Sequence, residues 1–487
     1  MISPHEEQPL NLGFAFGQVA EDGGDFPALI SDGLVISYAQ LWHLVRVLAA
    51  RMQERGIGQD SLVALNTTSM PLSLGVLLAT ALLGARFVEA GQILAQSGVL
   101  QPTHFLRSPE VRGSDRVQFE VIEDSWLARP GEDPDPARFP GYADPDAPWM
   151  YLHTSGSTGA PKYIALSQRM VHGRTMAVAP DFPRGAVTFA TLFGVTSRPF
   201  YARALGALLH LGAIVEGTDP AFWRQAGVNL VFASPAQLAR FLEINPIAPR
   251  IARVEVSGAA LSDEHARLFS QHFVEVIDVY GASETSKSFA NRVDVSPEGE
   301  VTRTGQKLDS SVEIVTDNGL PCAPGQIGAV RVRNPYMTQG YIAHPEASAR
   351  LFRDGWFHPG DIAVWGARGE LTVMGRDDDM INLGGQKVMG LVVDFLLTTV
   401  PGIKDAVCFK NPKPGAANEL LAFAVFDGTV EVGRATVEAM DVCKRRLGVV
   451  LAPRNIRPIT EVPRDAAGRP LRAVCQQLLL ERYLAHD

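Results

Sequence analysis

Apolar and polar positions along the chain follow two different periods. Residues 26–91 and 205–260 mix short continuous apolar runs with segments whose apolar residues recur every three to four positions. The run at 61–68 (SLVALNTT) predicts a buried strand, and 41–56 (LWHLVRVLAARMQERG) predicts an amphipathic helix that ends at Gly56. Strands that alternate with helices form parallel sheets with helices on their faces, so we expect an α/β fold.

The pattern changes twice in the second half of the chain. Residues 311–375 read as short strands separated by Pro, Gly and Asx turns, which is typical of a small β-rich subdomain. After the polar stretch GRDDDMINLGGQK, new apolar runs (DAVCFK, LLAFAVF) and a helical pattern (TVEAMDVCKRRLG) follow. We therefore expect a large N-terminal domain of stacked α/β sheets at 1–377, then a small mobile α+β domain at 378–487, with the boundary near Asp378.

Composition narrows the class of protein. The 487 residues are 46% apolar and 20% charged, as in an ordinary globular protein, and the net charge of −9 argues against a nucleic-acid partner. The longest uncharged apolar run, Pro71 to Ala85, suits a buried helix better than a membrane span, and the N-terminus has no signal-peptide pattern. The cysteines show no metal-binding spacing, which favours reduced thiols: Cys322, Cys408, Cys443 and Cys475. We expect a cytoplasmic monomer or homodimer.

Polar, glycine-containing segments follow several of the apolar runs. The stretch YLHTSGSTGAPK, residues 151–162, offers backbone N–H groups, hydroxyls and the charge of Lys162 directly after a predicted strand. Such a loop suits a phosphate, although a flexible linker has a similar composition. VSGAAL and DVYGASET are likewise apolar runs that lead into glycine and hydroxyl-bearing residues. Because ligands bind at the carboxyl ends of parallel strands, we expect the three segments to meet at one crevice.

Six motifs occur in order: YLHTSGSTGAPK, VYGASET, GWFHPGD, GRDDDMIN, LGGQKV and PRDAAGRPLR. Through them the chain, from about residue 26 to its end, resembles the adenylate-forming superfamily of acyl- and aryl-CoA synthetases, nonribosomal-peptide adenylation domains and luciferases. The resemblance implies that a carboxylate attacks the α-phosphate of ATP, giving an acyl-adenylate and pyrophosphate, and that a thiol then displaces AMP. It implies ATP and Mg²⁺ as cofactors, and CoA or a phosphopantetheine as the acceptor.

The resemblance also assigns nucleotide-binding residues. In the phosphate loop these are Thr154, Ser155, Gly156, Ser157, Thr158, Gly159 and Lys162; elsewhere they are Gly258, Ala259, Asp278, Val279, Tyr280, Gly281, Ser283, Asp361 and Arg376. Glu284 and Thr158 are expected to ligate Mg²⁺, while a glutamate at a helix N-terminus is the alternative for Glu284. Asp361 is expected to hold the ribose, with a turn aspartate as the alternative, and Tyr280 is equally compatible with a core aromatic.

The expected catalytic residues include one departure from the family. They are Arg469, Lys162, Thr158, Glu284 and Lys387, with Asp378 as the hinge. Arg469 stands where the resemblance implies a lysine that bridges the substrate carboxylate and the α-phosphate, and a guanidinium is not equivalent to an ammonium. Tyr163 and Asn382 also depart from the family pattern.

The acyl pocket implied by the resemblance contains Phe193, Ser197, Arg198, Gly258 and Tyr280. No aspartate occurs at 191–217, which disfavours an α-amino acid as substrate. Arg198 has two interpretations: recognition of a second anionic group on the substrate, or a surface arginine at the start of a helix.

These features predict an AMP-forming acid–thiol ligase for a small organic, aryl or acyl acid. A separate acyl-carrier protein is an open alternative to CoA as the acceptor. The competing hypotheses are a nucleotide-binding pseudoenzyme that has lost adenylation because of Arg469, and transfer of the adenylate to a nucleophile other than a thiol.

Overall fold

The computed structural model of this chain forms two compact units. The described residues are 10–31, 33–89, 99–115, 117–127, 131–142, 144–154, 162–316, 318–413, 418–464 and 470–483. The first unit comprises Met1–Val312 and Val332–Phe357, and the second comprises Glu313–Arg331 and His358–Asp487. Asp378, the predicted hinge, lies within the second unit, and movement about it stays a prediction.

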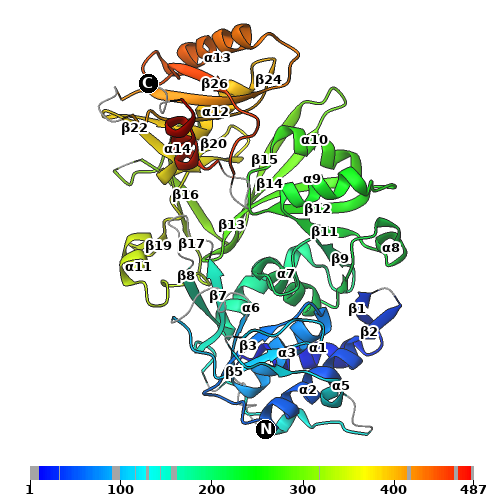
Figure 1. Cartoon of the computed structure of the whole chain (residues 1–487). Coiled ribbons are helices and arrows are strands. Elements are labelled where there is room, and N and C mark those ends of the chain that lie inside the picture. The colour runs from blue at the N-terminus through cyan, green and yellow to red at the C-terminus, as the bar shows by residue number, and fades with distance from the viewer. Residues whose placement is uncertain are drawn as a thin grey trace. The chain divides into compact units, whose positions relative to one another are not determined.

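A nine-stranded sheet dominates the first unit (Figure 1). In spatial order its strands are β15 (Val301–Lys307), β14 (Ser286–Val295), β13 (Phe273–Ala282), β12 (Ile251–Ser257), β11 (Leu230–Ala233), β9 (Thr188–Thr191), β10 (Ala213–Val215), β1 (Pro27–Ser31) and β2 (Leu34–Ser37). The strands from β13 to β1 run parallel, while β14, β15 and β2 are antiparallel to their neighbours. The carboxyl ends of β9, β11, β12 and β13 therefore lie at one edge of the sheet.

A six-stranded sheet forms the other layer of this unit. Its strands, in order, are β6 (Glu120–Val121), β5 (His104–Arg107), β3 (Leu62–Asn66), β4 (Arg86–Glu89), β7 (Pro148–Thr154) and β8 (Lys162–Ser167). All neighbours are parallel except β7 and β8, which pair antiparallel. The predicted strand at 61–68 is thus confirmed as β3.

One continuous core joins the inner faces of the two sheets. The helices that contribute to it are α1 (Leu12–Gly23), α2 (Tyr38–Glu54), α3 (Met70–Leu83), α6 (Gln168–Ala177) and α7 (Arg198–Leu208). Phe87 of one sheet and Phe232 of the other belong to the same cluster of buried residues. The uncharged run at 71–85 is buried along almost its whole length as α3, because apolar neighbours surround that helix on all sides.

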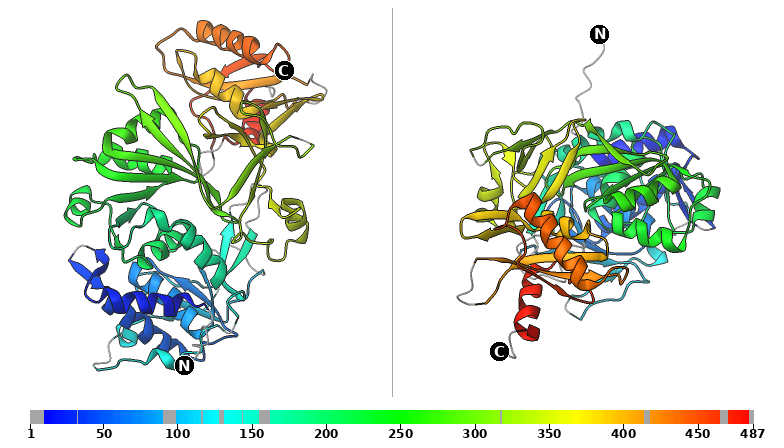
Figure 2. Two further views of the ribbon diagram at one scale, coloured as in Figure 1. Left: turned by 180° about the vertical axis from the view of Figure 1, so that it is seen from behind. Right: turned by 90° about the horizontal axis from the view of Figure 1, so that it is seen from above.

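Three helices cover the outer face of the nine-stranded sheet (Figures 1 and 2). They are α8 (Pro220–Gln225), α9 (Pro235–Ile244) and α10 (Asp263–His272). Smaller elements complete the unit: α5 (Asp124–Leu127), α11 (Pro345–Leu351), β18 (Phe352–Arg353) and β19 (Trp356–Phe357). Helices on both faces of a largely parallel sheet confirm the predicted α/β class.

The second unit contains a β-rich part and an α+β part. The β-rich part holds most of β16 (Ser311–Val315) and of β17 (Ile327–Arg333). It also holds β20 (Asp361–Trp365), β21 (Leu371–Arg376) and the hairpin of β22 (Met380–Leu383) and β23 (Gln386–Met389). The α+β part is a three-stranded sheet of β24 (Ile403–Lys410), β25 (Leu420–Phe426) and β26 (Asn455–Pro458). Helices α12 (Gly390–Thr398) and α13 (Val432–Leu447) cover one face of this sheet, and α14 (Arg472–Tyr483) covers the other.

All four cysteines lie in the second unit and carry free thiols. Cys408, Cys443 and Cys475 are buried, whereas Cys322 is half-buried. The expectation of reduced thiols agrees with this arrangement.

Candidate active site

The predicted phosphate loop connects two antiparallel strands of the six-stranded sheet. Thr154, the last residue of β7, pairs in register with Lys162, the first residue of β8. Thr154 is buried and Lys162 is half-buried. The positions between them, which include Ser155, Gly156, Ser157, Thr158 and Gly159, lie outside the described residues.

Glu284 lies in the tight turn between β13 and β14. The turn has an irregular register at Tyr280 and Gly281, where any side chain on Gly281 would clash with the carbonyl oxygen of Ser286. Ser286 itself has a φ of 62°, in the left-handed region that non-glycine residues rarely adopt. The alternative interpretation of Glu284, a glutamate at a helix N-terminus, is therefore wrong: this residue sits between two strands.

The carboxylate of Glu284 is buried and oriented by a tyrosine. Tyr341 donates its hydroxyl proton to Oε1 of Glu284 over 2.7 Å, and Glu284 is 6% exposed. Lys162 Nζ lies 5.6 Å from the centroid of the Tyr341 ring, within range of a cation–π interaction. Tyr341 thus brings two predicted site residues, Lys162 and Glu284, into one neighbourhood.

Arg174 fixes the backbone of the same turn. Its guanidinium donates to the carbonyl oxygens of Ser283 (3.0 Å), Glu284 (2.8 Å) and Tyr336 (3.1 Å). Burial, followed by the nearby charge of Arg198, lowers the pKa of Arg174 to about 9. We call Lys162, Arg174, Glu284 and Tyr341 the Glu284 cluster.

Sequence reasoning missed Arg174 and Tyr341. Arg174 is one of several polar residues on α6, and Tyr341 lies 57 positions from the glutamate that it orients. Neither has a local sequence pattern that distinguishes it, because both are recruited by contacts that only the folded chain creates.

The Glu284 cluster fits the magnesium ion that the resemblance implies. Mg²⁺ is bound in phosphate-transfer sites by one or two carboxylates together with substrate phosphates. Glu284 offers a single oriented carboxylate, and no group of three His, Cys, Asp or Glu side chains among the described residues could hold a metal by itself. This donor set suits an ion shared with a phosphate.

The strands β12 and β13 carry the remaining predicted nucleotide-binding positions of this unit. Gly258 follows β12 with a φ of 92°, a conformation that favours glycine, and Ala259 beside it is exposed. Val279 is buried within β13, and Tyr280 next to it is half-buried.

Asp278 has a perturbed acidity. Burial raises its pKa to about 6, against the opposing effects of the Arg303 charge and a hydrogen bond from Asn291. The carboxyl group of Asp278 therefore binds a proton more readily than an ordinary aspartate does.

The predicted acyl-pocket segment follows β9 and leads into α7. Phe193 N donates to Thr191 Oγ1 over 3.0 Å, and Ser197 caps α7 by accepting from Phe200 N. Arg198, the first residue of α7, is half-buried. Burial, together with the charge of Arg203, lowers its pKa, while the charge of Glu284 acts in the opposite direction.

Other predicted residues lie in the second unit. Asp361 begins β20 and forms an ion pair with Arg376, whose Nη1 lies 3.4 Å from Oδ1. Arg376 also donates to the carbonyl oxygen of Pro359 over 2.6 Å. Asp378 belongs to a 3₁₀ turn at Asp377–Asp379, and Lys387 belongs to β23. Arg469 lies outside the described residues.

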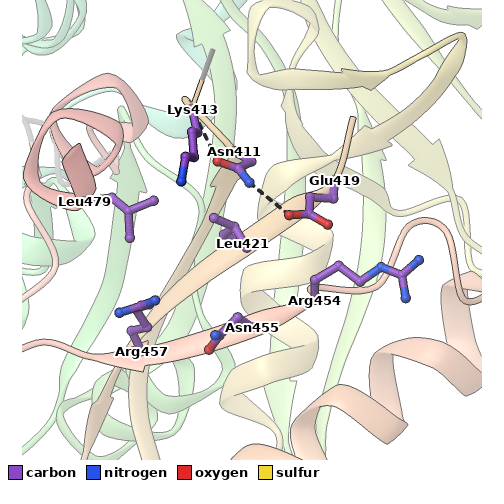
Figure 3. A pocket seen from close by; sticks show the side chains of 8 residues that line it. All are labelled: Asn411, Lys413, Glu419, Leu421, Arg454, Asn455, Arg457 and Leu479. Carbon is purple, nitrogen blue, oxygen red and sulfur yellow. Dashed lines mark hydrogen bonds between the residues drawn. The ribbon is translucent and has the colours of Figure 1, made fainter. Parts of the chain in front are cut away.

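The second unit also contains a small surface cavity of about 270 Å³ beside the three-stranded sheet (Figure 3). It is lined by Asn411, Lys413, Glu419, Leu421, Arg454, Asn455, Arg457 and Leu479. Asn411 donates to Glu419 over 2.9 Å. A wider cavity of about 540 Å³ lies in the first unit between Leu308 and Gly355. Neither contains a predicted site residue.

Comparison with known proteins gives one family match. The protein-family model described as "AMP-binding enzyme" matches residues 16–342 of this chain. Within the described ranges, every helix is too short or too polar to cross a membrane.

The proteins to which this chain is similar include two curated relatives and one solved structure. The sulfoacetate–CoA ligase of Cupriavidus necator is 28% identical over 340 residues, which cover 67% of this chain and 66% of the relative, slightly less than two thirds of its length. The indoleacetate–CoA ligase of Aromatoleum aromaticum is 26% identical over 92% of this chain and 94% of the relative. The O-succinylbenzoate coenzyme A synthetase of Bacillus subtilis in complex with AMP shares the fold, with a TM-score of 0.78, 20% identity and coverage of 96% and 98% of the two chains.

Proposed function

This chain belongs to the family of AMP-binding enzymes, and we propose that it activates a small carboxylic acid with ATP and passes the acyl group to CoA. In the first half-reaction a carboxylate oxygen attacks the α-phosphorus of ATP, the bond to the bridging oxygen of the β-phosphate breaks, and pyrophosphate leaves. In the second, the CoA sulfur attacks the acyl carbon, the bond to AMP breaks, and the thiol proton passes to solvent.

The single observation that carries the proposal is the Glu284 cluster. Phosphoryl-type transfer depends on positioning and on charge stabilisation rather than on a protein nucleophile. Lys162 and the oriented carboxylate of Glu284 supply a cation and an anion beside the ends of the strands that flank the phosphate loop. Mg²⁺ bound at Glu284 would offset the negative charge of the phosphates.

The remaining residues receive roles by the same proposal. Thr154, Ser155, Gly156, Ser157, Thr158 and Gly159 are proposed to surround the β- and γ-phosphates, and Thr158 to share the metal. Asp361, held in place by Arg376, is proposed to accept hydrogen bonds from the ribose hydroxyls. Arg469 is proposed to bridge the carboxylate and the α-phosphate, and Lys387 to lie on the surface used in the thioester step.

The relatives' names leave the acid open. Sulfoacetate carries a second acidic group, whereas indoleacetate is an aryl acid with one carboxylate. Both relatives are named as ligases, so the pseudoenzyme alternative is not supported. A phosphopantetheine on a separate acyl-carrier protein is the alternative acceptor to CoA that we propose.

Acid-dependent release of pyrophosphate tests the function. The purified chain is mixed with ATP, Mg²⁺ and one acid at a time, with and without CoA. We expect pyrophosphate with particular acids only, and an acyl-CoA thioester when CoA is present. ATP binding without pyrophosphate release for any acid would contradict the proposal, and release with no thioester would indicate a different acceptor.

Glu284→Gln provides the matched variant for this assay. Without the carboxylate charge, we expect the Mg²⁺ concentration for half-maximal pyrophosphate release to rise at least several-fold. Glu298→Gln, an exposed glutamate in the same unit, should leave it unchanged.

A further inference from the structure

Arg198 stands at the edge of the sheet where the other predicted pocket residues gather. It follows β9 through the turn at 192–197, which is closed by a hydrogen bond from Ser197 N to the Gly194 carbonyl oxygen over 2.9 Å. Because β9 and β12 are parallel, this turn and Gly258 leave the same edge of the sheet. The cap from Ser197 fixes the position at which α7, and with it the Arg198 side chain, begins.

Arg198 is half-buried, and its guanidinium has no hydrogen-bond partner or ion-pair partner among the described residues. This observation disfavours the alternative of a surface arginine that extends into solvent.

Two arginines, Arg174 and Arg203, act on Arg198 through their charges, and each has hydrogen-bond partners of its own. Arg174 donates to three backbone carbonyl oxygens. Arg203, on the same helix as Arg198, donates to Oε2 of Glu255 over 2.7 Å. The local balance of charge is therefore positive, with Glu284 as the acidic group that acts on Arg198.

A partly buried guanidinium that no anion contacts directly is costly, because it loses part of its hydration and forms no hydrogen bond or ion pair in exchange, even with the more distant charge of Glu284. Such a group is stabilised when an anion arrives from outside the chain, and a guanidinium binds a carboxylate or sulfonate bidentately. The segment that carries Arg198 also carries Phe193 and Ser197, whereas the phosphate loop belongs to the β7–β8 hairpin of the other sheet. This placement favours the acid over the nucleotide as the source of the anion.

We propose that Arg198 recognises a second anionic group, a carboxylate or a sulfonate, on the acid that this protein activates. The inference rests on the proposed function and narrows its substrate class to small dianionic acids. Arg198 is a specificity-determining residue in this scheme, and the reacting carboxylate is bound elsewhere.

The test compares each diacid with its own monomethyl ester. Diacids of three to six carbons and their esters are assayed for pyrophosphate release with the wild-type chain, Arg198→Gln and Arg198→Lys. We expect the wild type to prefer the free diacid in kcat/KM, and Arg198→Gln to reduce that preference about 10- to 100-fold, the effect of one lost charge-assisted interaction. Arg198→Lys should restore part of it.

The control variant is Arg169→Gln, which removes an exposed arginine on the neighbouring helix α6. It should leave the diacid preference unchanged. Thermal unfolding of each variant shows whether a loss reflects misfolding.

Three outcomes would overturn the proposal. A similar loss for diacids and esters in Arg198→Gln would mean that the arginine holds the reacting carboxylate. A raised KM for ATP with every acid would mean that it holds a phosphate. A wild type that prefers the ester would mean that no second anion is recognised.

Calorimetry separates this inference from the proposed function. Binding of the diacid is measured in the presence of a non-hydrolysable ATP analogue. Arg198-dependent binding of the diacid without turnover would support the inference while the proposed function fails. Turnover of monoacids alone would support the function while the inference fails.

Discussion

Tyr341 orients the carboxylate of Glu284 through a hydrogen bond of 2.7 Å, and its ring lies beside Lys162. A metal-binding carboxylate is effective when a neighbouring group fixes its rotamer. The tyrosine therefore acts as a positioning residue, since its hydroxyl contacts the glutamate and not the reacting atoms.

Tyr341→Phe removes this hydrogen bond and keeps the ring beside Lys162. We expect the Mg²⁺ concentration for half-maximal pyrophosphate release to rise about 10-fold, at the lower limit for loss of such an outer contact. A titration with Mg²⁺ at saturating ATP measures it. Tyr142→Phe, a buried tyrosine that donates to the Ala85 carbonyl oxygen elsewhere in the unit, is the control and should leave the magnesium titration unchanged.

Asp278 links pH to stability. Its pKa is raised to about 6 in the fold, so the folded chain binds more protons at this residue than the unfolded chain between about pH 4 and pH 6. The free energy of unfolding should fall as the pH rises through this window. Asp278→Asn removes the effect and should stabilise the first unit at pH 8 by about 2 to 3 kcal/mol, with little change at pH 4.

Urea unfolding followed by tryptophan fluorescence at the two pH values checks this prediction. Asp294→Asn, an exposed aspartate on β14, serves as the control. If Asp278→Asn and the wild type have parallel pH profiles, burial does not perturb this carboxyl group.

At the scale of elements, a buried ionic group ties together the segments that carry the site. Glu255 on β12 is 1% exposed and contacts Arg203 of α7 (2.7 Å), Arg253 (2.6 Å) and Lys287 of β14 (3.0 Å). Asp181 binds Arg253 and Lys287 as well. Burial alone would raise the pKa of Glu255, but the charges of Lys287, Arg203 and Arg253 outweigh it and lower the pKa to about 2. We call these five residues the Glu255 network.

The Glu255 network fixes α7, β12 and β14 with respect to one another. Arg198 begins α7, Gly258 follows β12, and Glu284 lies in the turn that leads into β14. The network therefore positions three parts of the candidate site without contacting a substrate.

Glu255→Gln leaves two buried cations, Arg203 and Lys287, and the half-buried Arg253 with one carboxylate. We expect a loss of about 3 to 5 kcal/mol in the free energy of unfolding, because the remaining charges stay buried and uncompensated. Glu275→Gln is the matched control on the adjacent strand β13, where a half-exposed glutamate faces Arg292 at 3.6 Å, and it should change stability by less than about 1 kcal/mol. Similar losses for the two variants would show that the network does not stabilise the fold.

The sequence predicts the elements better than the contacts between them. The helix at 41–56 has a helical period of apolar residues and the strand at 61–68 is a continuous apolar run, so both were predictable and are confirmed as α2 and β3. The Glu255 network was not predictable, because Asp181 and Lys287 lie 106 positions apart and meet only when the sheet forms. The sequence also left open whether Glu284 lies at a helix N-terminus. The turn between two strands in which it lies could not be predicted, because nothing in the local sequence indicates the left-handed backbone of its neighbour Ser286.

For the whole molecule, the two proposed half-reactions provide separate measurements. Arg469 is predicted to serve adenylation alone, whereas Lys387 is predicted to serve the thioester step. Arg469→Ala should lower adenylation about 10- to 100-fold through loss of a charged contact, and should change thioester formation from a presynthesised acyl-adenylate by less than about threefold. Arg469→Lys should retain or raise adenylation.

Single-turnover assays check this prediction. A mixture of ATP and acid measures adenylation, and a mixture of acyl-adenylate and CoA measures thioester formation. Arg446→Ala, which removes another arginine of the second unit, is the control. Adenylation by Arg469→Ala at the wild-type rate would show that the arginine does not reach the reacting groups.

The confinement of every cysteine to the second unit gives that unit its own chemical reporter. Burial raises the pKa of Cys443 and Cys475 to about 11 and that of Cys408 well above its ordinary value, so these thiols are both protonated and shielded at pH 8. They become reactive when the second unit opens. Five of the six tryptophans, Trp42, Trp126, Trp149, Trp223 and Trp356, lie in the first unit, whereas Trp365 lies in the second, so in a Trp365→Phe variant tryptophan fluorescence reports on the first unit alone. Thiol labelling and tryptophan fluorescence, recorded on the intact Trp365→Phe chain in increasing urea, should therefore show whether ATP protects one unit or both.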